Sequence, residues 1–262
     1  MNGALYTAST GLRAQETNVN IISNNIANLS TTGFKKQRAE FQDLLYQDYL
    51  RAGTNSSDTN TIIPTGIQIG IGVSTGAVYR ITTQGSLTQT DNNLDLAIQG
   101  HGYFQVQLPD GENAYTRDGS FQLNAQGQIV TAQGYTVVPG ITVPANSTAI
   151  TVNSSGQVSV TIDKQLAPQV VGQLTIATFI NDAGLSAQGN NLFLETEASG
   201  PPVQGNPGTV GFGTLKQGFV EASNVDVVSE ITNLITAQRA YEQNSRVISA
   251  TDQMLQNLNQ IS

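Results

Sequence analysis

Residues 1–33 read MNGALYTASTGLRAQETNVNIISNNIANLSTTG, and apolar side chains recur in them every seven positions. One heptad line holds Leu5, Leu12, Val19 and Ile26, and a second line, three residues later, holds Ala8, Gln15, Ile22 and Leu29. Such a stripe is typical of an amphipathic helix that packs against another helix. No proline interrupts the pattern before Ser30-Thr31-Thr32-Gly33, so the sequence predicts a helix of about 25 residues.

The opposite end of the chain carries the same seven-residue period. Its main line holds Val220, Val227, Leu234, Tyr241, Ile248 and Leu255, and the stripe is widened by Val228, Ile231, Ile235 and Leu258. Ser223 followed by Asp226 resembles a helix capping box, and Asn224 is an equally good cap. A helix over 226–259 would be roughly 50 Å long at 1.5 Å per residue, which is too long for a compact domain of this size.

Between the two ends the pattern changes to alternation of apolar and polar residues. Leu94 and Leu96 alternate in this way, as do Val158 and Val160, and turn sequences such as Asp118-Gly119 separate the segments. Short strands with regular turns indicate an antiparallel sandwich or barrel-like body. The predicted fold class is therefore α+β, with long N- and C-terminal α-helices that pair with each other and an inserted antiparallel β-rich domain.

Two polar stretches suggest how the chain divides into domains. Residues 53–60 contain no apolar side chain and 200–213 is rich in Gly and Pro, which is typical of loops or extended connections. We expect a terminal helical domain of residues 1–32 plus 224–262, a connecting region of 33–70 plus 213–223, and a β-rich outer domain of 71–212.

The apolar stripes are wider than one pair of helices can cover. Ile21, Val228 and Ile235 lie off the heptad seam and would remain in water in an isolated pair. A stripe of this width favours contact with further helices. Simple packing of the helices on the β-rich body is the alternative.

The sequence offers no catalytic or metal-binding constellation. His101 is the only histidine, and it lies between two glycines, as an ordinary turn or strand-start histidine does. The chain has no cysteine, so it lacks zinc ligands, and no glycine run has the spacing of a dinucleotide or phosphate site. We expect neither enzymatic activity nor a cofactor. Residues 1–10 lack the segments of a cleaved secretory signal, and no stretch is apolar enough for a membrane span.

Acidic residues concentrate in the middle of the chain. The formal net charge is -8, and residues 71–212 hold nine acidic side chains against three basic ones. This balance argues against nucleic acid as a partner, because phosphate binding requires clustered Lys and Arg. The one basic cluster, Lys35, Lys36 and Arg38, is expected to be solvated surface.

Several motifs resemble those of the bacterial flagellar rod and hook family. The N-terminal motif is 24–35 (NNIANLSTTGFK), and the C-terminal one combines 213–228 with 237–241 (AQRAY). In the middle, 99–104 (QGHGYF) and 115–121 (YTRDGSF) are similar to the β domain that the family shares. The resemblance covers nearly the whole chain, and the chain's length and residues 48–73 are most similar to the distal-rod branch of the family.

The resemblance implies a structural subunit that polymerises into a rigid helical tube and transmits torque from motor to hook across the periplasm. It implies as partners further copies of the chain, other rod proteins, the hook protein, the surrounding basal-body ring proteins and, during secretion, the export apparatus. It implies export without a cleaved signal peptide, no nucleic acid and no membrane insertion. The alternative within the family is the neighbouring large proximal rod protein; a non-flagellar surface filament subunit or a peptidoglycan hydrolase is more remote.

Three sets of residues follow from the heptads and the resemblance. Subunit packing is expected at Leu5, Leu12, Val19, Ile22, Ile26, Leu29, Val227, Ile231, Leu234, Tyr241, Ile248 and Leu255. The family signature comprises Asn25, Asn28, Gly33, Phe34, Asn224, Gln238, Arg239 and Tyr241. A stiffening segment over 46–66 includes Arg51, Pro64 and Gly66, with a mobile loop as the alternative.

The acidic middle suggests one further role. In a tube of stacked subunits it would face the surrounding rings through weak, averaged charge contacts. The residues expected to do so, each individually replaceable, are Asp110, Glu112, Asp182, Glu195 and Glu197. Solubility alone is an equally good explanation of the charge.

Overall fold

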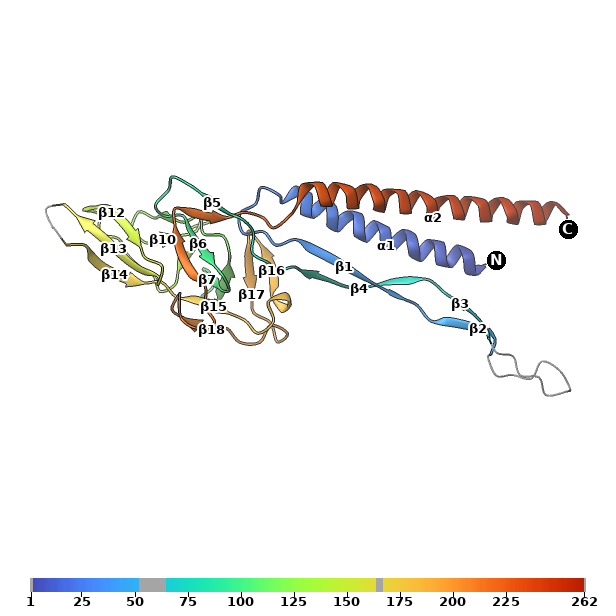
Figure 1. Ribbon diagram of the computed structural model, residues 1–262, viewed down its shortest axis with the longest axis horizontal. Coiled ribbons are helices and arrows are strands. Elements are labelled where there is room, and N and C mark those ends of the chain that lie inside the picture. Colours follow the sequence, from blue (N-terminus) through green and yellow to red (C-terminus); the bar gives the residue numbers. More distant parts are fainter. Residues whose placement is uncertain (1, 52–64, 164–166, 262) are drawn as a thin grey trace. The chain divides into compact units, whose positions relative to one another are not determined.

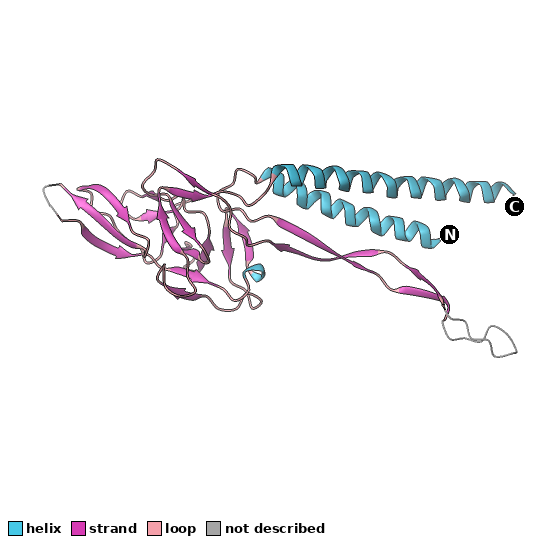
Figure 2. Ribbon diagram, in the orientation of Figure 1, coloured by secondary structure: helices cyan, strands magenta, loops and turns pink. Residues whose placement is uncertain are grey.

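The computed structural model describes residues 2–51, 65–163 and 167–261, and packing divides the chain into two units. The helical unit comprises Met1–Ile26, Gln37–Tyr79 and Asp226–Ser262, and the β unit comprises Ala27–Lys36 and Arg80–Val225. Figure 2 shows the two long helices of the first unit and the many strands of the second. Residues 33–36 and 213–223, which were expected in the connecting region, pack within the β unit.

Two long helices form the ends of the chain, as the heptad periods predict. α1 spans Asn2–Ala27 (26 residues) and α2 spans Val227–Ile261 (35 residues), and they lie side by side in Figure 1. The cap of α2 differs from both candidates of the sequence analysis, because Oδ1 of Asp226 accepts the backbone N–H of Ser229 at 2.8 Å. No helix in the described residues is long and apolar enough to cross a membrane.

A long two-stranded hairpin completes the helical unit. β1 (Gln37–Asp43) pairs with β4 (Val73–Arg80), and β2 (Tyr46–Leu50) pairs antiparallel with β3 (Ile67–Gly70). α1 contacts this hairpin through threonine hydroxyls. Oγ1 of Thr7 lies 3.0 Å from the carbonyl oxygen of Ile71, and Oγ1 of Thr10 accepts the N–H of Val73 at 3.3 Å. The polar stretch 53–60 lies outside the described residues.

The β unit is built from antiparallel sheets. The largest has nine strands in the order β16-β17-β8-β7-β11-β10-β9, with β15 pairing to both β7 and β18. Its strands are β7 (Tyr103–Gln107), β8 (Asn113–Thr116), β9 (Gln122–Leu123), β10 (Ile129–Val130), β11 (Thr136–Val137), β15 (Ile176–Thr178), β16 (Ser186–Gly189), β17 (Leu192–Leu194) and β18 (Val203–Gly205). A short 3-10 helix, Asp182–Gly184, precedes β16.

The described part of the β unit also contains three smaller sheets, and two of them pair strands from its first and last parts. β12 (Ser147–Val152), β13 (Gln157–Ile162) and β14 (Gln169–Gln173) form one sheet of three strands. β6 (Leu96–Gln99) pairs with β19 (Thr214–Gln217), and β5 (Leu87–Gln89) pairs with β20 (Phe219–Glu221). The segment that leads into α2 is therefore tied into the sheets by two strand pairs.

The hydrophobic core lies within the β unit. Successive side chains of a strand point to opposite faces, so neighbours in β7 enter two clusters. Phe104 packs with Val106, Phe121 and Ile176 in the larger cluster. The smaller cluster comprises Tyr103, Tyr115, Ala177, Leu185 and Phe193. The predicted α+β class is confirmed, with paired terminal helices and an inserted antiparallel β-rich part.

Candidate assembly surface of the helical unit

The side of α2 that contacts α1 is polar or small rather than apolar. The most buried residues of α2 are Glu230 (3% exposed), Ala237 (2%) and Thr251 (4%), and with Asn244 they recur every seven positions. A Cβ atom on Gly11 of α1 would lie 2.9 Å from Nδ2 of Asn244, so the two helices approach closely there. The apolar heptad line predicted on α2 is thus not the line that faces α1.

That apolar line of α2 is only partly covered within the chain. Val227, Ile231 and Tyr241 are exposed (37%, 45% and 45%), and Leu234, Ile248 and Leu255 are half-buried. Further exposed apolar residues of α2 are Val228, Ile235, Val247 and Met254. Apolar side chains gathered along one face of an element mark a contact surface for another protein.

The expected packing residues on α1 and just after it are more covered. Ile22 is buried, and Leu5, Leu12, Val19, Ile26 and Leu29 are half-buried. Ile21, which was expected to remain in water, is also buried at 8% exposure, so that expectation was wrong. Since α1 packs against both α2 and the hairpin, its apolar side is partly covered within the chain and partly open.

The hairpin adds a second exposed apolar surface. Its exposed large side chains are Phe41, Leu45, Tyr46, Tyr49, Leu50, Ile67, Ile69 and Val78. Tyr49 and Ile69 line a mainly apolar pocket of about 870 Å³ together with Tyr6 of α1 and Val247 of α2. A hydrogen bond from Tyr46 to Asp43, together with the charge of Asp43, raises the pKa of Tyr46. The helical unit therefore exposes apolar groups on its strands as well as on α2.

The predicted stiffening residues lie near the tip of this hairpin. The side chain of Arg51 is exposed, with Nε 3.8 Å from a carboxylate oxygen of Asp48. Gly66 is half-buried and directly precedes β3. Pro64 lies outside the described residues.

Asn25 of the family signature connects α1 to α2 and to the hairpin. It is 1% exposed, and its Nδ2 donates to Oε2 of Glu230 at 3.1 Å. The same amide exchanges two hydrogen bonds with the backbone of Gln37, at 2.9 and 2.8 Å. An amide side chain suits this position because it donates and accepts at once.

Gly33, another signature residue, occupies a backbone position that excludes other side chains. Its φ is +67°, and a Cβ atom there would lie 2.8 Å from the carbonyl carbon of Arg117. Its N–H donates to the backbone oxygen of Glu221 at 2.7 Å. Glycine meets both requirements, since it adopts positive φ without a steric penalty.

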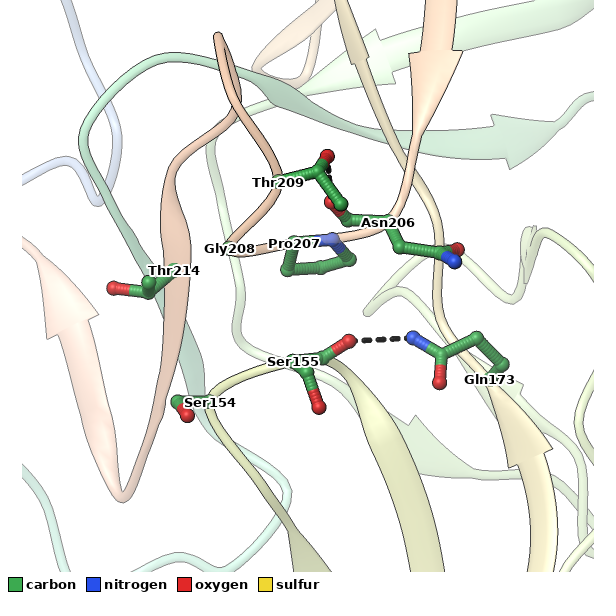
Figure 3. A pocket seen from close by; sticks show the side chains of 8 residues that line it. All are labelled: Ser154, Ser155, Gln173, Asn206, Pro207, Gly208, Thr209 and Thr214. Carbon is green, nitrogen blue, oxygen red and sulfur yellow. Dashed lines mark hydrogen bonds between the residues drawn. The ribbon is translucent and has the colours of Figure 1, made fainter.

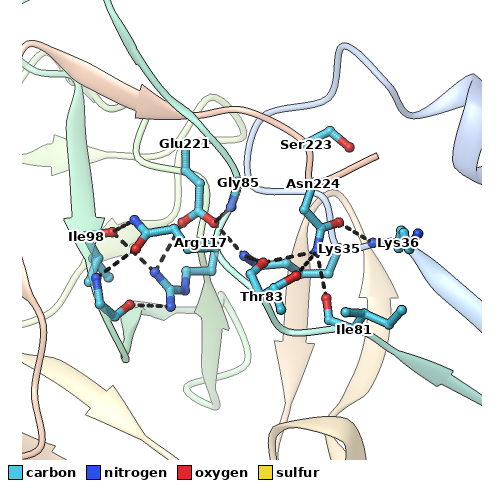
Figure 4. Close-up of polar contacts among 12 residues, drawn as sticks. Lys35, Lys36, Ile81, Thr83, Gly85, Ile98, Arg117, Glu221, Ser223 and Asn224 are labelled. Atoms are coloured by element: carbon cyan, nitrogen blue, oxygen red, sulfur yellow. Dashed lines mark hydrogen bonds and ion pairs between the residues drawn. The ribbon is translucent and has the colours of Figure 1, made fainter. Parts of the chain in front are cut away.

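Asn224 joins three segments of the β unit, as Figure 4 shows. Its Oδ1 accepts the N–H of Lys36 at 2.7 Å, and its Nδ2 donates to the carbonyls of Ile81 and Thr83 at 2.8 and 3.0 Å. Its backbone N–H donates to the carbonyl of Phe34 at 3.4 Å. Asn28 accepts a hydrogen bond from the Thr31 hydroxyl in the turn after α1.

The remaining signature residues are placed quite differently. Gln238, Arg239 and Tyr241 lie on α2 and are exposed. The signature thus separates into residues that fix the chain's own fold and residues that a partner can reach.

Lys35, which was expected on a solvated surface, is instead buried at 3% exposure. Its Nζ lies 2.5 Å from Oε1 of Glu221, and Nη1 of Arg117 lies 3.1 Å from Oε2 of the same carboxylate (Figure 4). Burial lowers the pKa of Lys35, and the charge of Glu221 offsets this only in part. Of the other two residues in the expected basic cluster, Lys36 is half-buried and Arg38 is exposed.

Glu221 is the residue that the sequence analysis missed. It is 1% exposed and accepts from both cations and from the N–H of Gly85 at 3.0 Å. Nη2 of Arg117 donates in addition to the carbonyl of Gly100 at 2.7 Å. The available sequence signal was that Glu221 is the only acid between 213 and 225, the stretch that leads into the C-terminal helix.

Nothing in the geometry suggests catalysis. Across 2–51, 65–163 and 167–261 there is no group of three or more His, Asp and Glu residues that could hold a metal ion. His101 is exposed and lies two residues before the start of β7. A pocket of about 520 Å³ in the β unit is lined only by uncharged residues, among them Ser154, Ser155 and Gln173 (Figure 3).

Comparison with known proteins supports the same reading. Residues 5–35 match the family model for the flagella basal body rod protein, 97–160 the flagellar hook protein FlgE/F/G D1 domain, and 216–261 the flagellar basal body rod FlgEFG protein C-terminal region. The flagellar basal-body rod protein FlgG of Caulobacter vibrioides is 61% identical over 98% of this chain and 98% of its own. FlgG of Buchnera aphidicola subsp. Acyrthosiphon pisum is 53% identical (98% and 99% covered), and FlgG of Bacillus subtilis is 40% identical (97% and 97%).

These matches define the class as the axial structural proteins of the flagellar rod and hook. Within that class, the chain belongs to the FlgG family of flagellar basal-body rod proteins. It is a non-enzymatic structural subunit of the distal rod and polymerises within the basal body. The expected family and the expected distal-rod role are confirmed.

Proposed function

We propose that copies of this chain join through the apolar residues of the helical unit into a rigid helical tube that transmits torque from motor to hook across the periplasm. The observation that carries this proposal is the exposed apolar line of α2, which includes Val227, Ile231 and Tyr241. In an assembled tube these side chains leave water, which stabilises the contact by about 25 cal/mol per Å² of apolar surface buried.

The twelve packing residues divide by how much contact they already have. Ile22 is already buried within the chain and stabilises the pair of helices. The residues that we assign to contacts between subunits are Leu5, Leu12, Val19, Ile26, Leu29, Val227, Ile231, Leu234, Tyr241, Ile248 and Leu255, which are half-buried or exposed. Gln238 and Arg239 join this surface, because they are exposed on the same helix.

We assign the layers of the tube from the difference between the apolar surface of the helices and the acidic surface of the β-rich domain. The terminal helical domain, 1–32 plus 224–262, forms the inner layers, and the β-rich domain, 71–212, faces outward. Of the expected connecting region, 37–70 joins the layers of the helical unit, and 33–36 plus 213–223 join the layer of the β unit. Support comes from the acidic character of 71–212, which suits a surface in solvent better than a subunit contact.

The proposed partners besides further copies of the chain are the other rod proteins, the hook protein, the surrounding ring proteins and the export apparatus. Export without a cleaved signal peptide requires the subunit to pass unfolded and to complete its helices on assembly. In support, α2 buries few residues within the chain, namely Glu230, Ala237 and Thr251. Because a long helix gains most of its stability from packing, α2 would be completed only when further subunits cover it.

We assign the segment 46–66 to stiffening of the tube through contacts between neighbouring subunits. The exposed aromatic and aliphatic residues of β2 and β3 support this, among them Tyr46, Tyr49 and Ile69. Apolar side chains on an uncovered two-stranded hairpin are poorly stabilised in water and favour burial against another chain.

Electron microscopy of the purified full chain under assembly conditions tests the proposal. Straight tubes are expected, and sedimentation at low concentration is expected to give a monomer. Failure to form any ordered polymer over a wide range of concentration and salt would contradict the proposal.

A further inference from the structure

Three segments of the β unit carry every passage of the chain between the two units. The chain enters the β unit after residues 26 and 79 and leaves it after residues 36 and 225. We call 27–36 the entry segment, 80–86 the return segment and 221–225 the exit segment. Along the chain, a force applied to either end reaches the entry or the exit segment before it reaches the nine-stranded sheet.

The three segments are bound to one another by hydrogen bonds. The N–H of Ile81 in the return segment donates to the carbonyl of Lys36 in the entry segment at 2.9 Å. The N–H of Ala222 in the exit segment donates to the carbonyl of Ser86 in the return segment at 2.8 Å. The side chain of Asn224 bridges all three, since it binds both Lys36 and Ile81 (Figure 4). The points at which the chain enters and leaves the β unit are therefore cross-linked.

Buried charges add to these contacts. The carboxylate of Glu221 in the exit segment lies 2.5 Å from Nζ of Lys35 in the entry segment and 3.1 Å from Nη1 of Arg117. Nζ of Lys35 also donates to the carbonyl of Thr83 in the return segment at 3.0 Å. Hydrogen bonds between charged groups are stronger than neutral ones, and the Lys35 and Glu221 side chains are at most 2% exposed.

The entry and exit segments run in the same direction. Gly33 donates its N–H to the carbonyl of Glu221, and further along both segments Asn224 donates its N–H to the carbonyl of Phe34 and accepts the N–H of Lys36. α1 precedes the entry segment and α2 follows the exit segment. A pull on the two chain ends therefore acts at opposite ends of this pair of segments. Such a load shears the pair, so that its contacts must break together.

The two helices respond to the same pull in a different way. Asn25 of α1 binds Glu230 of α2, and Gly11 of α1 lies against Asn244, so the helices run in opposite directions. A pull on the chain ends acts at one end of the helix pair and separates its contacts one after another. The helices should therefore open under a smaller force than the entry and exit segments.

We propose that the cross-linked entry, return and exit segments form a mechanical clamp, which bears tension on the chain ends and keeps it from the chain between residues 36 and 221. Its use in the rod rests on the proposed torque-bearing function. The clamp itself lies within one subunit, so it can be measured without a polymer.

Optical tweezers test the clamp in the full monomeric chain. The chain has no cysteine, so a cysteine added at each end attaches the handles. At constant force the helices should open first, and the chain between residues 36 and 221 should extend in a second event after a longer lifetime. Asn224→Ala should shorten this lifetime about tenfold through its lost hydrogen bonds. Glu221→Gln, which breaks the buried ion pairs, should shorten it on the order of a hundredfold.

Asn124→Ala is the matched control. Asn124 is half-buried like Asn224, and its side chain forms hydrogen bonds with Gln126 and Gln128 in a turn outside the clamp. It should leave the lifetime of the second event unchanged. A second pair of handles, on cysteines that replace Gln133 and Ser186, loads the large sheet and leaves the clamp out of the path between them. Asn224→Ala should have little effect in that geometry.

Three results would overturn the proposal. Equal shortening by Asn224→Ala and Asn124→Ala with handles at the chain ends would show an ordinary loss of stability. An equal effect of Asn224→Ala with both pairs of handles would show the same. Extension of the whole chain in one event with the helices would show that the three segments bear no load. Where Glu221→Gln does not fold, Asn224→Ala decides the question alone. None of these results depends on tube formation, so failure of the clamp is distinct from failure of the proposed function.

Discussion

The β unit and the helical unit bury their apolar side chains to very different extents. In the β unit Phe104, Phe121 and Ile176 are at most 1% exposed. In the helical unit Val228 is 75% exposed and Tyr49 is 63% exposed. The first unit encloses a core of its own, whereas the second carries much of its apolar surface on the outside.

This difference indicates where the stability of each unit comes from. The β unit is fixed by its sheets and by the buried contacts of Lys35, Arg117 and Glu221, all within one chain. In the helical unit the buried residues of α2 are polar or small and few large apolar side chains are buried, among them Ile21 and Ile22, so association adds to its stability. Under the proposed export before assembly this division is an advantage, because only the assembled state completes the packing of the helical unit.

The largest expected effect comes from placing a charge on the open surface of α2. Ile248→Asp should abolish tube formation, because an unpaired carboxylate buried at a contact between helices costs several kcal/mol. Leu12→Asp should act in the same way. Electron microscopy measures the polymer, and thermal unfolding should show the β unit unchanged. Gln243→Asp adds the same charge at an exposed polar position and is the control. Normal tubes from Ile248→Asp would show that this line is not a subunit contact.

A charge deletion in the β unit should act on stability instead. Glu221→Gln leaves two buried cations without a carboxylate, and breaking a buried pair in this way costs about 3–5 kcal/mol. Urea unfolding of the dilute monomer measures the loss. Glu197→Gln, an exposed residue, should change the free energy of unfolding by no more than about 0.5 kcal/mol. Equal effects of the two substitutions would mean that the cluster does not hold the β unit together.

Limited proteolysis of the dilute monomer should show directly that the helices open more easily than the β unit. Cleavage is expected first within α1 and α2, leaving a resistant fragment from about residue 27 to about residue 225, because unpacked helices open locally at little free-energy cost. The fragment should retain 33–36 and 214–221, which are tied into the β unit by β19, β20 and the contacts of Lys35. Mass spectrometry identifies its ends. If both helices resist as long as the β unit does, the helical unit is stable without partners.

Deleting 53–60 should affect the polymer and leave the monomer intact. If the segment stiffens contacts between subunits, the shortened chain should form tubes that bend or lose control of length. Tube curvature in electron micrographs is the measurement. A chain in which 53–60 is scrambled at constant length separates the need for length from the need for sequence. Straight tubes from the deletion variant would contradict the stiffening role.

The sequence predicted the elements better than it predicted their contacts. Both helices follow from heptad lines, and the β-rich middle follows from alternation and turns. The heptads could not show that α2 packs Glu230, Ala237 and Thr251 against α1. An apolar heptad line predicts a contact surface, but it does not specify which helix covers that surface. When that partner is another subunit, the seam within the chain is free to be polar.

Two further features were hidden for a physical reason. β1 and β2 are exposed along most of their length, so no buried face imposed alternation on their residues. The buried Lys35 is paired with the carboxylate of Glu221, which lies 186 residues away in the chain. The local sequence around Lys35 gives no information about a contact so distant in the chain. Side chains whose environment depends on long-range packing, such as Lys35 and Glu221, could not be placed from sequence alone.

The smallest expected effect is a pH dependence that belongs to the β unit. The pKa of Lys35 is lowered from 10.5 by burial, so between the lowered pKa and 10.5 the unfolded chain binds more protons than the folded one. The free energy of unfolding therefore rises as pH increases through that window, by up to about 1.4 kcal/mol for each unit of pKa difference. Lys35→Met removes this contribution, and its stability profile should be flatter than that of the unmodified chain. Lys216→Met, which removes an exposed lysine, is the control and should keep the slope. Urea unfolding at several pH values below 10.5 compares the three chains, and parallel profiles for all of them would show that Lys35 keeps the same proton affinity in the folded and unfolded states.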